Sequence, residues 1–214
     1  MSAQSNSRRR FLKTGCLAAG AVGLTVCGAS LVALAPDPSP VALPSLSYGE
    51  GTMNNRILVA YATYAGSTAE VAAEIGKMLG QRGFSVDVKP IKEKPSLDGY
   101  TAVLVGSAVQ RGKWLPEAVD FVKTNQGALN RVPVALFCVH ITNTGNDEKS
   151  RQTRLTFLNE VRPLVPRASE VFFPGRFDRR GAALLMPGFV ARFVPTFDLR
   201  DWTKIRAWAQ AVFA

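Results

Sequence analysis

The sequence predicts an α/β fold in which helices cover both faces of a parallel sheet, a doubly wound arrangement. Two observations lead to this prediction. From Arg56 onward, short apolar runs typical of buried strands alternate with longer stretches that carry apolar residues at helical spacing. The composition, 47% hydrophobic and 20% charged over 214 residues, is that of an ordinary globular protein. Ligands of such sheets bind beyond the carboxyl ends of the strands.

The first half of the expected domain contains three strands and two helices. Residues 57–61 are apolar throughout, as expected of a strand buried on both faces. The helix that follows presents an apolar face made of Val71, Ile75, Met78 and Leu79. Residues 84–89 alternate between apolar and polar, and residues 101–105 are again apolar, which predicts the second and third strands. Pro116 is well suited to the first turn of the next helix.

The second half continues the same alternation. Residues 132–139 and 170–173 are apolar runs that predict the fourth and fifth strands. Leu155, Leu158 and Val161 indicate a third helix between these two strands. A closing helix presents an apolar stripe made of Trp202, Ile205, Trp208, Ala209 and Val212.

The N-terminal segment has the features of an export signal. Residues 7–13, Ser-Arg-Arg-Arg-Phe-Leu-Lys, resemble the twin-arginine signal pattern, and a weakly apolar stretch follows. We therefore expect residues 1–35 to be a twin-arginine signal or a membrane anchor, residues 36–55 a flexible linker, and residues 56–214 the folded domain. Cleavage and retention of the leader both stay open. The domain is expected to lie outside the cytoplasm, anchored to the membrane.

Composition argues against several functional classes. The net charge is +10, but the basic residues lack the interleaved aromatic residues of a single-strand nucleic-acid surface, so no nucleic-acid partner is expected. Cys16 and Cys27 lie in the leader, which leaves only Cys138 in the domain and excludes a disulfide framework there. His140 is the only histidine, and no metal site is expected.

A loop suited to bind an anion lies between the first strand and the following helix. Backbone N–H groups at a helix start are unpaired and attract negative charge. Gly66 lets the backbone approach a ligand closely, and Thr63, Ser67 and Thr68 carry hydroxyls that can donate to phosphate oxygens. No lysine follows, as it would in a nucleoside-triphosphate loop, so a monophosphate fits better. The alternative is that Ser67 or Thr68 only caps the helix.

This loop resembles the phosphate loop of flavodoxins, Thr-x-Thr-Gly-x-Thr. Thr63, Gly66 and Thr68 match that pattern, and Ala65 replaces the middle threonine, a departure that implies modestly weaker binding. The resemblance implies a five-stranded parallel sheet of order 2-1-3-4-5 and FMN as the cofactor. It places the cofactor's phosphate against Thr63, Tyr64, Ala65, Gly66, Ser67 and Thr68.

The end of the third strand resembles the second flavin loop of the menaquinone-dependent protoporphyrinogen IX oxidases, a flavodoxin-like family. The similarity runs from about Arg56 to the C-terminus and includes the insertion at residues 176–194. By this resemblance Trp114 packs at the edge of the flavin ring; the alternative is that Trp114 packs on the core. The resemblance also places the backbone of Ser107, Ala108, Val109, Gln110, Arg111 and Gly112 along the ring.

Positive charge near the ring bears on the reduction potential. Arg111 and Lys113 would stabilise the anionic reduced flavin and raise its potential, which suits electron transfer to a quinone. Alternatively, both are solvated loop charges. In the third loop, Thr142 and Asn143 are the expected ring contacts, since no stacking tyrosine is present. His140 is either a proton donor or, more simply, a histidine hydrogen-bonded within the fold.

The insertion at residues 176–194 places four arginines around an apolar body. Such a segment can lie on a membrane surface or line a site for an apolar, acid-bearing substrate. In the resembling family this region contacts membrane and substrate. The alternative is a helix that completes the core and leaves its arginines in solvent.

Together these features predict an FMN-dependent oxidoreductase that passes electrons from a reduced donor to a quinone-type acceptor. No catalytic acid–base residue is expected, because electron or hydride transfer requires none. The export signal does not suit haem synthesis in the cytoplasm, so a diverged extracytoplasmic relative is expected. An exported electron carrier without its own substrate and a flavin-free binding module are the alternatives.

Overall fold

The computed structural model describes residues 43–49, 55–183, 186, 188–191 and 193–214 of the chain. The leader expected over residues 1–35 lies outside the described residues, as does most of the expected linker. Among the helices of the described residues, none is both long enough and apolar enough to span a membrane.

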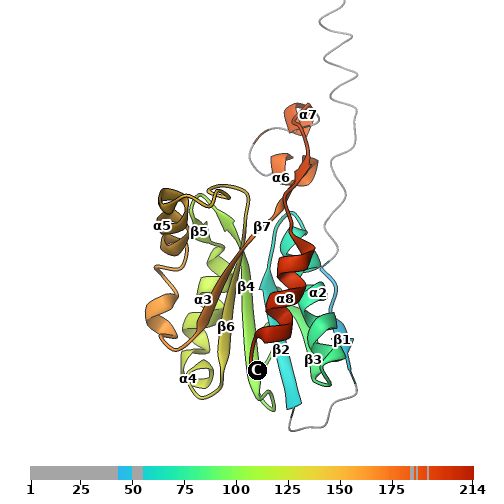
Figure 1. Ribbon diagram of the computed structural model, residues 1–214, viewed down its shortest axis with the longest axis vertical. Helices are drawn as coiled ribbons and strands as arrows, with labels where there is room; N and C mark the ends of the chain where they lie inside the picture. Colours follow the sequence, from blue (N-terminus) through green and yellow to red (C-terminus); the bar gives the residue numbers. More distant parts are fainter. Residues whose placement is uncertain (1–42, 50–54, 184–185, 187, 192) are drawn as a thin grey trace, which may run out of the picture.

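The centre of the fold is a parallel sheet built from the five predicted strands (Figure 1). These pair in the order β3-β2-β4-β6-β7, which is 2-1-3-4-5 along the chain and confirms the predicted topology. Their bounds are β2 Arg56–Ala62, β3 Ser85–Pro90, β4 Ala102–Gln110, β6 Val134–His140 and β7 Ser169–Pro174.

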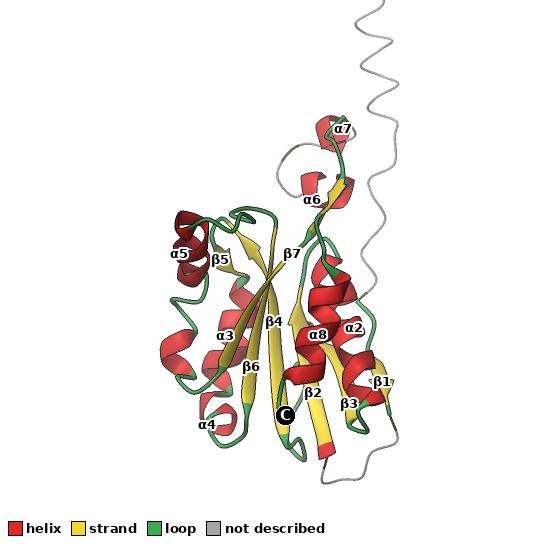
Figure 2. Cartoon of the chain, viewed as in Figure 1, coloured by secondary structure: helices red, strands yellow, loops and turns green. Residues whose placement is uncertain are grey.

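Helices cover both faces of the sheet, as Figure 2 shows. On one face lie α2 (Ser67–Gln81) and α8 (Trp202–Ala211), and on the other lie α3 (Pro116–Thr124) and the short α4 (Gln126–Leu129). Successive side chains of β2 point to opposite faces, so Ile57, Val59 and Tyr61 pack under α2 while Leu58, Ala60 and Ala62 pack under α3. Two buried cores therefore share one sheet, and a continuous apolar run is the sequence pattern that this requires. Short 3-10 turns at Ile91–Glu93 and Arg162–Leu164 complete the connections.

The third predicted helix differs from the expectation. Helix α5 spans Glu148–Thr156, buries none of its side chains and leaves Leu155 41% exposed. It begins at Asp147, whose carboxylate accepts the Ser150 backbone N–H at 2.9 Å. Leu158 and Val161 are fully buried, but they lie in the turns after the helix. The spacing of Leu155, Leu158 and Val161 therefore does not mark one helical face, because only Leu155 lies in the helix and the other two lie in the turns after it.

The expected linker at residues 36–55 contains an element of the domain. Residues Leu46–Tyr48 form strand β1, which pairs antiparallel with β3 at the edge of the sheet. Leu46 and Tyr48 pack against the α2 core, and the Tyr61 hydroxyl donates to the Pro44 carbonyl at 2.9 Å. The prediction of a flexible spacer is therefore wrong for this stretch, because two alternating apolar side chains are enough to hold an edge strand.

A tight hairpin and an insertion lie at the carboxyl ends of the strands. Strand β5 (Lys113–Trp114) folds back on β4 through Arg111 and Gly112, which have φ values of 52° and 77°. Two positive φ values are typical of a type I′ turn, which suits the twist of paired strands. The insertion follows β7 and projects beyond the sheet (Figure 1). In the structure it extends past the predicted end at residue 194 and contains β8 Arg176–Phe177, α6 Arg179–Ala183, α7 Gly188–Ala191 and β9 Phe197–Asp198, with β8 and β9 antiparallel.

Candidate functional site

A cavity of about 340 Å³ lies at the carboxyl ends of the central strands, where ligands of such sheets bind. All three predicted flavin loops contribute to its wall. Eleven of the predicted site residues line it: Thr63, Tyr64, Ala65, Ser67, Thr68, Ala108, Val109, Gln110, Arg111, Gly112 and Thr142.

Four predicted site residues do not line this cavity: Gly66, Ser107, Trp114 and Asn143. Seven residues that were not predicted as cofactor contacts do line it: Leu115, Val139, Ile141, Gly175, Arg176, Phe177 and Gly181. Most of these come from segments that directly follow β6 and β7, and their position after a strand is the sequence signal that could have identified them.

The phosphate loop is shaped by Gly66 and by two hydroxyl oxygens. Gly66 has a φ of 92°, and its backbone N–H donates to Thr63 Oγ1 at 3.0 Å. Ser67 Oγ accepts the backbone N–H of Arg176 at 3.0 Å. Helix α2 begins at Ser67, its N-cap residue is Gly66, and no side chain caps it. The capping role considered for Ser67 or Thr68 is therefore wrong.

The side-chain hydroxyl of Thr68 indicates whether this loop suits a phosphate. Its side chain is fully buried, and among the described residues its Oγ1 has no hydrogen-bond partner. A buried hydroxyl left unpaired costs about 1–3 kcal/mol. Since the oxygens of Thr63 and Ser67 accept backbone N–H groups, their hydroxyl hydrogens are left to donate outward. Three hydroxyl donors beside a helix start fit a phosphate monoester such as that of FMN.

Replacing Thr68 with valine is expected to change stability and binding in opposite directions. The apo protein should gain about 1 kcal/mol of stability, because an unpaired buried hydroxyl becomes a methyl of similar shape. The FMN affinity should fall at least about tenfold, because one phosphate donor is lost. Thermal unfolding of the apo protein and flavin fluorescence titration measure the two effects. Thr203→Val, at an exposed position of α8, is the control and should change neither. An unchanged FMN affinity in Thr68→Val would rule out this role.

The second loop presents backbone and one cation to the cavity. Arg111 lines the wall at the tip of the type I′ turn. Lys113 points elsewhere and pairs with Glu160 at 2.8 Å in solvent, so only one of the two predicted cations is at the cavity. Ser107 is buried, and its Oγ accepts the Leu115 N–H at 3.0 Å and donates to the Ala108 carbonyl at 2.8 Å. Its role is to fix the loop and not to line the cavity.

Trp114 packs in the core beneath the second loop. It is 4% exposed, and its indole N–H donates to Cys138 Sγ at 3.0 Å. Alternation along β5 decides this placement, because Trp114 sits opposite Val109 and turns inward while Lys113 turns outward. The prediction that Trp114 packs at the ring edge is therefore wrong, and its alternative, packing on the core, holds. Burial raises the pKa of the Cys138 thiol, which keeps it neutral.

The third loop contributes Thr142 and Ile141. Asn143 does not line the cavity; its φ is 56°, and its carbonyl accepts a hydrogen bond from Arg154. His140 is 2% exposed, and its Nδ1 lies 2.7 Å from the Thr142 carbonyl oxygen. Burial lowers the pKa of His140, so the neutral ring donates its Nδ1 proton to that carbonyl. His140 thus holds the loop from below, which is the simpler of the two readings of this residue.

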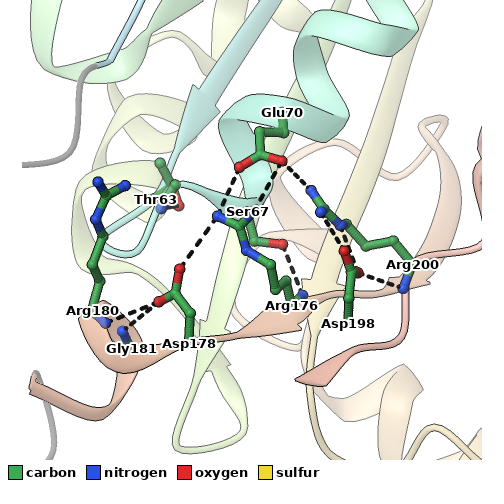
Figure 3. A network of polar contacts seen from close by, with 10 residues as sticks. Thr63, Ser67, Glu70, Arg176, Asp178, Arg180, Gly181, Asp198 and Arg200 are labelled. Atoms are coloured by element: carbon green, nitrogen blue, oxygen red, sulfur yellow. Dashed lines mark hydrogen bonds and ion pairs between the residues drawn. The ribbon is translucent and has the colours of Figure 1, made fainter. Parts of the chain in front are cut away.

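The insertion closes the cavity on the side of β7. Glu70, in the first turn of α2, pairs with Arg176 at 2.8 Å and also with Arg200 (Figure 3). Arg176 is also paired with Asp178 at 3.3 Å, and Arg200 with Asp198. These ion pairs join both ends of the insertion to the helix that carries the phosphate loop. A second, more open cavity of about 680 Å³ shares Arg176 with the first; its other lining residues are Asp178, Arg179, Arg180, Thr196, Phe197 and Asp198.

Comparison with known proteins agrees with this geometry. A family profile described as "Flavodoxin domain" matches residues 58–183, more than half of the 214-residue chain. The chain belongs to the flavodoxin domain family. No curated protein sequence matches the chain.

Solved flavodoxins resemble this flavodoxin-domain chain at low identity. A flavodoxin from the domain Archaea is 15% identical with a TM-score of 0.48, and the match covers 73% of this chain and 95% of that one. A short-chain flavodoxin associated with a non-canonical PDU bacterial microcompartment is 17% identical with a TM-score of 0.49, over 73% and 95%. The Fusobacterium nucleatum flavodoxin bound to flavin mononucleotide is 14% identical with a TM-score of 0.40, over 54% and 68%. All these scores lie below 0.5, so the assignment rests on the family profile.

Membership of the flavodoxin domain family supports FMN as the cofactor of this chain. The site fits that cofactor on its own chemistry, because hydroxyl donors line the same cavity as mostly apolar side chains and loop backbone. An apolar wall suits a flat aromatic ring, and hydroxyl donors suit a phosphate.

Proposed function

We propose that this protein binds FMN and passes electrons from a reduced donor to a quinone-type acceptor, in the manner of the quinone-dependent protoporphyrinogen IX dehydrogenases that its sequence resembles. One observation carries the proposal: the flavodoxin-type phosphate loop and the backbone of the second loop line the same cavity at the carboxyl ends of the strands. FMN, when bound, supplies one- and two-electron chemistry. The protein supplies binding, orientation and electrostatics.

Each part of the cavity has a distinct task in this proposal. Thr63, Ser67 and Thr68 bind the phosphate and so fix the cofactor's position. The backbone of residues 108–112 lies along the ring, held in place by the type I′ turn and by the buried Ser107. A rigid hairpin holds its donors and acceptors ready before binding, which reduces the entropy lost on ordering them.

We further propose that the protein acts at the outer side of a cytoplasmic membrane. The twin-arginine pattern of the leader supports export of a folded domain. The insertion supports contact with a membrane surface, because Phe193, Phe197 and Leu199 are exposed and Phe197 lines the second cavity together with Arg179 and Arg180 of α6. Fractionation of cells that produce the full chain, with and without Arg8→Lys and Arg9→Lys, tests export; equal retention in the cytoplasm by both would contradict it.

The decisive experiment is an absorbance spectrum of the purified full chain after incubation with FMN and removal of the excess. Retained flavin bands are expected, followed by reoxidation of the dithionite-reduced protein on addition of a soluble quinone. Porphyrinogen is then tested as the donor. Fast reoxidation by protein partners but not by quinone would favour the electron carrier. A protein that retains no flavin would overturn the redox proposal and leave a flavin-free binding module.

Charge reversal at Arg111 is expected to lower the midpoint potential of the bound FMN. Arg111→Asp replaces a cation at the cavity wall with an anion, and this change opposes reduction to an anionic flavin. The midpoint potential should fall by an amount on the order of tens of millivolts. Arg111→Asn should shift the potential by about half as much. Asparagine tolerates positive φ, so this variant removes the charge without straining the turn. Potentiometric titration measures the shift.

The control for this prediction is Lys123→Glu, which makes the same change of charge at an exposed position of α3. It should leave the potential close to that of the wild type. Equal shifts in the Arg111 and Lys123 variants would mean that only net charge matters. No shift in Arg111→Asp would show that Arg111 does not act on the flavin.

A further inference from the structure

Helix α6 of the insertion lies against the phosphate loop at the residue where the loop departs from the flavodoxin pattern. Gly181 of α6 lines the cofactor cavity, and a Cβ atom built on Gly181 would lie 3.7 Å from the Cβ of Ala65. Ala65 stands where the flavodoxin loop carries its middle threonine. Helix α6 therefore packs directly on the phosphate loop at this position.

The position of α6 is fixed by Asp178. The Asp178 carboxylate accepts the backbone N–H groups of Arg180 at 3.0 Å and Gly181 at 3.1 Å, and it also pairs with Arg176 (Figure 3). The backbone N–H of Arg176 donates in turn to Ser67 Oγ in the phosphate loop. A short chain of polar contacts therefore runs from the loop to α6, and it sets where the side chain of Arg180 emerges.

Arg180 differs from Arg176 and Arg200 in having no acidic partner in the part of the chain that the structure describes. The guanidinium groups of Arg176 and Arg200 are paired with Glu70, Asp178 and Asp198. Within the described part of the chain, Arg180 forms no ion pair, although it is half-buried. Arg180 lines the second cavity, which shares Arg176 with the cofactor cavity, and its side chain extends toward Thr63 of the phosphate loop (Figure 3). A half-buried cation without a counter-charge among the described residues therefore lies on the side of the phosphate loop that faces α6.

We propose that Arg180 is a phosphate-specificity residue that neutralises the phosphate of FMN from α6 and compensates for the hydroxyl lost at Ala65. This inference rests on the proposed FMN binding. Ordinary hydroxyl donors satisfy phosphate oxygens without balancing their charge, whereas a guanidinium does both. The insertion thus has a direct role in cofactor choice: Arg180 favours the phosphorylated flavin over riboflavin, which has the same ring but no phosphate.

The test measures the affinities of FMN and riboflavin for the full chain in its apo form, by quenching of flavin fluorescence. Arg180→Ala is expected to weaken FMN binding at least about tenfold, equivalent to about 1.4 kcal/mol, and to leave riboflavin binding unchanged. Arg180→Lys should keep most of the FMN affinity. Arg179→Ala is the matched control, since it removes a neighbouring exposed arginine of α6, and it should change neither affinity.

Each other result has a definite meaning. Equal losses of FMN and riboflavin affinity in Arg180→Ala would show that Arg180 only packs α6 in place, which overturns the inference. Unchanged FMN affinity would overturn it as well. A wild-type chain that binds neither flavin would overturn the proposed function together with this inference. The thermal midpoints of the apo variants check folding, and Arg180→Gln replaces Arg180→Ala if the alanine variant unfolds.

Discussion

Gly106→Ala is expected to destabilise the protein by more than about 3 kcal/mol, through overpacking of the centre of the sheet. A Cβ atom on Gly106 would lie 1.9–2.4 Å from three ring carbons of Phe137. Phe137 is fully buried and is the direct partner of Gly106 on the neighbouring strand β6. Strand β4 would have to shift, and because it carries the second loop, FMN affinity should fall with stability.

Urea denaturation of the apo protein measures this effect. Gly127→Ala is the matched control, because a Cβ atom at Gly127 in α4 meets nothing within 4 Å. That substitution should leave stability unchanged or raise it by up to about 1 kcal/mol. The double variant Gly106→Ala/Phe137→Leu should recover part of the loss, since leucine vacates the volume that the new methyl needs. A Gly106→Ala protein within about 1 kcal/mol of the wild type would contradict this packing.

Starting the chain at Arg56 is expected to cost on the order of 2–4 kcal/mol compared with starting it at Leu43. The shorter chain loses β1, the packing of Leu46 and Tyr48 on the α2 core, and the bond from Tyr61 to the Pro44 carbonyl. It also loses the Ser47 hydroxyl that donates to Asp87 at 2.7 Å. Urea denaturation of the two chains under identical conditions measures the difference.

Tyr61→Phe in the longer chain serves as the control for the truncation. It removes only the hydrogen bond to Pro44 and should cost about 1 kcal/mol. Equal stability of the two chains would mean that β1 contributes nothing, and residues 43–49 would then be the spacer that the sequence predicted.

The sheet and the phosphate loop could be predicted because their signals are local. A strand buried on both faces needs an unbroken apolar run, and five such runs alternating with helical patterns leave few topologies. The loop at residues 63–68 was recognisable because hydroxyls and a glycine lie between a strand and a helix. In both cases the residues that carry the signal are neighbours in the sequence, so a short window contains the information.

Some features that the sequence did not reveal depend on contacts between distant segments, and one depends on strand register. Strand β1 has only two inward apolar side chains in a stretch rich in proline and serine, too few for a periodic signal. The orientation of Trp114 follows from the register of a two-residue hairpin, and a shift of one residue would have turned it the other way. Arg176 and Gly181 reach the cavity because β7 ends beside α2, more than a hundred residues away in the chain.

The two ends of the insertion lie side by side in the fold. The Leu199 N–H donates to the Gly175 carbonyl at 3.1 Å, and Arg176 and Phe177 pair with Asp198 and Phe197. Because the two ends are closed on each other, the sheet sets only the point at which the chain leaves after β7 and returns before α8. A change of length between the paired ends would therefore leave the pairing of the five strands as it is, while it would change what reaches the cavity from this side.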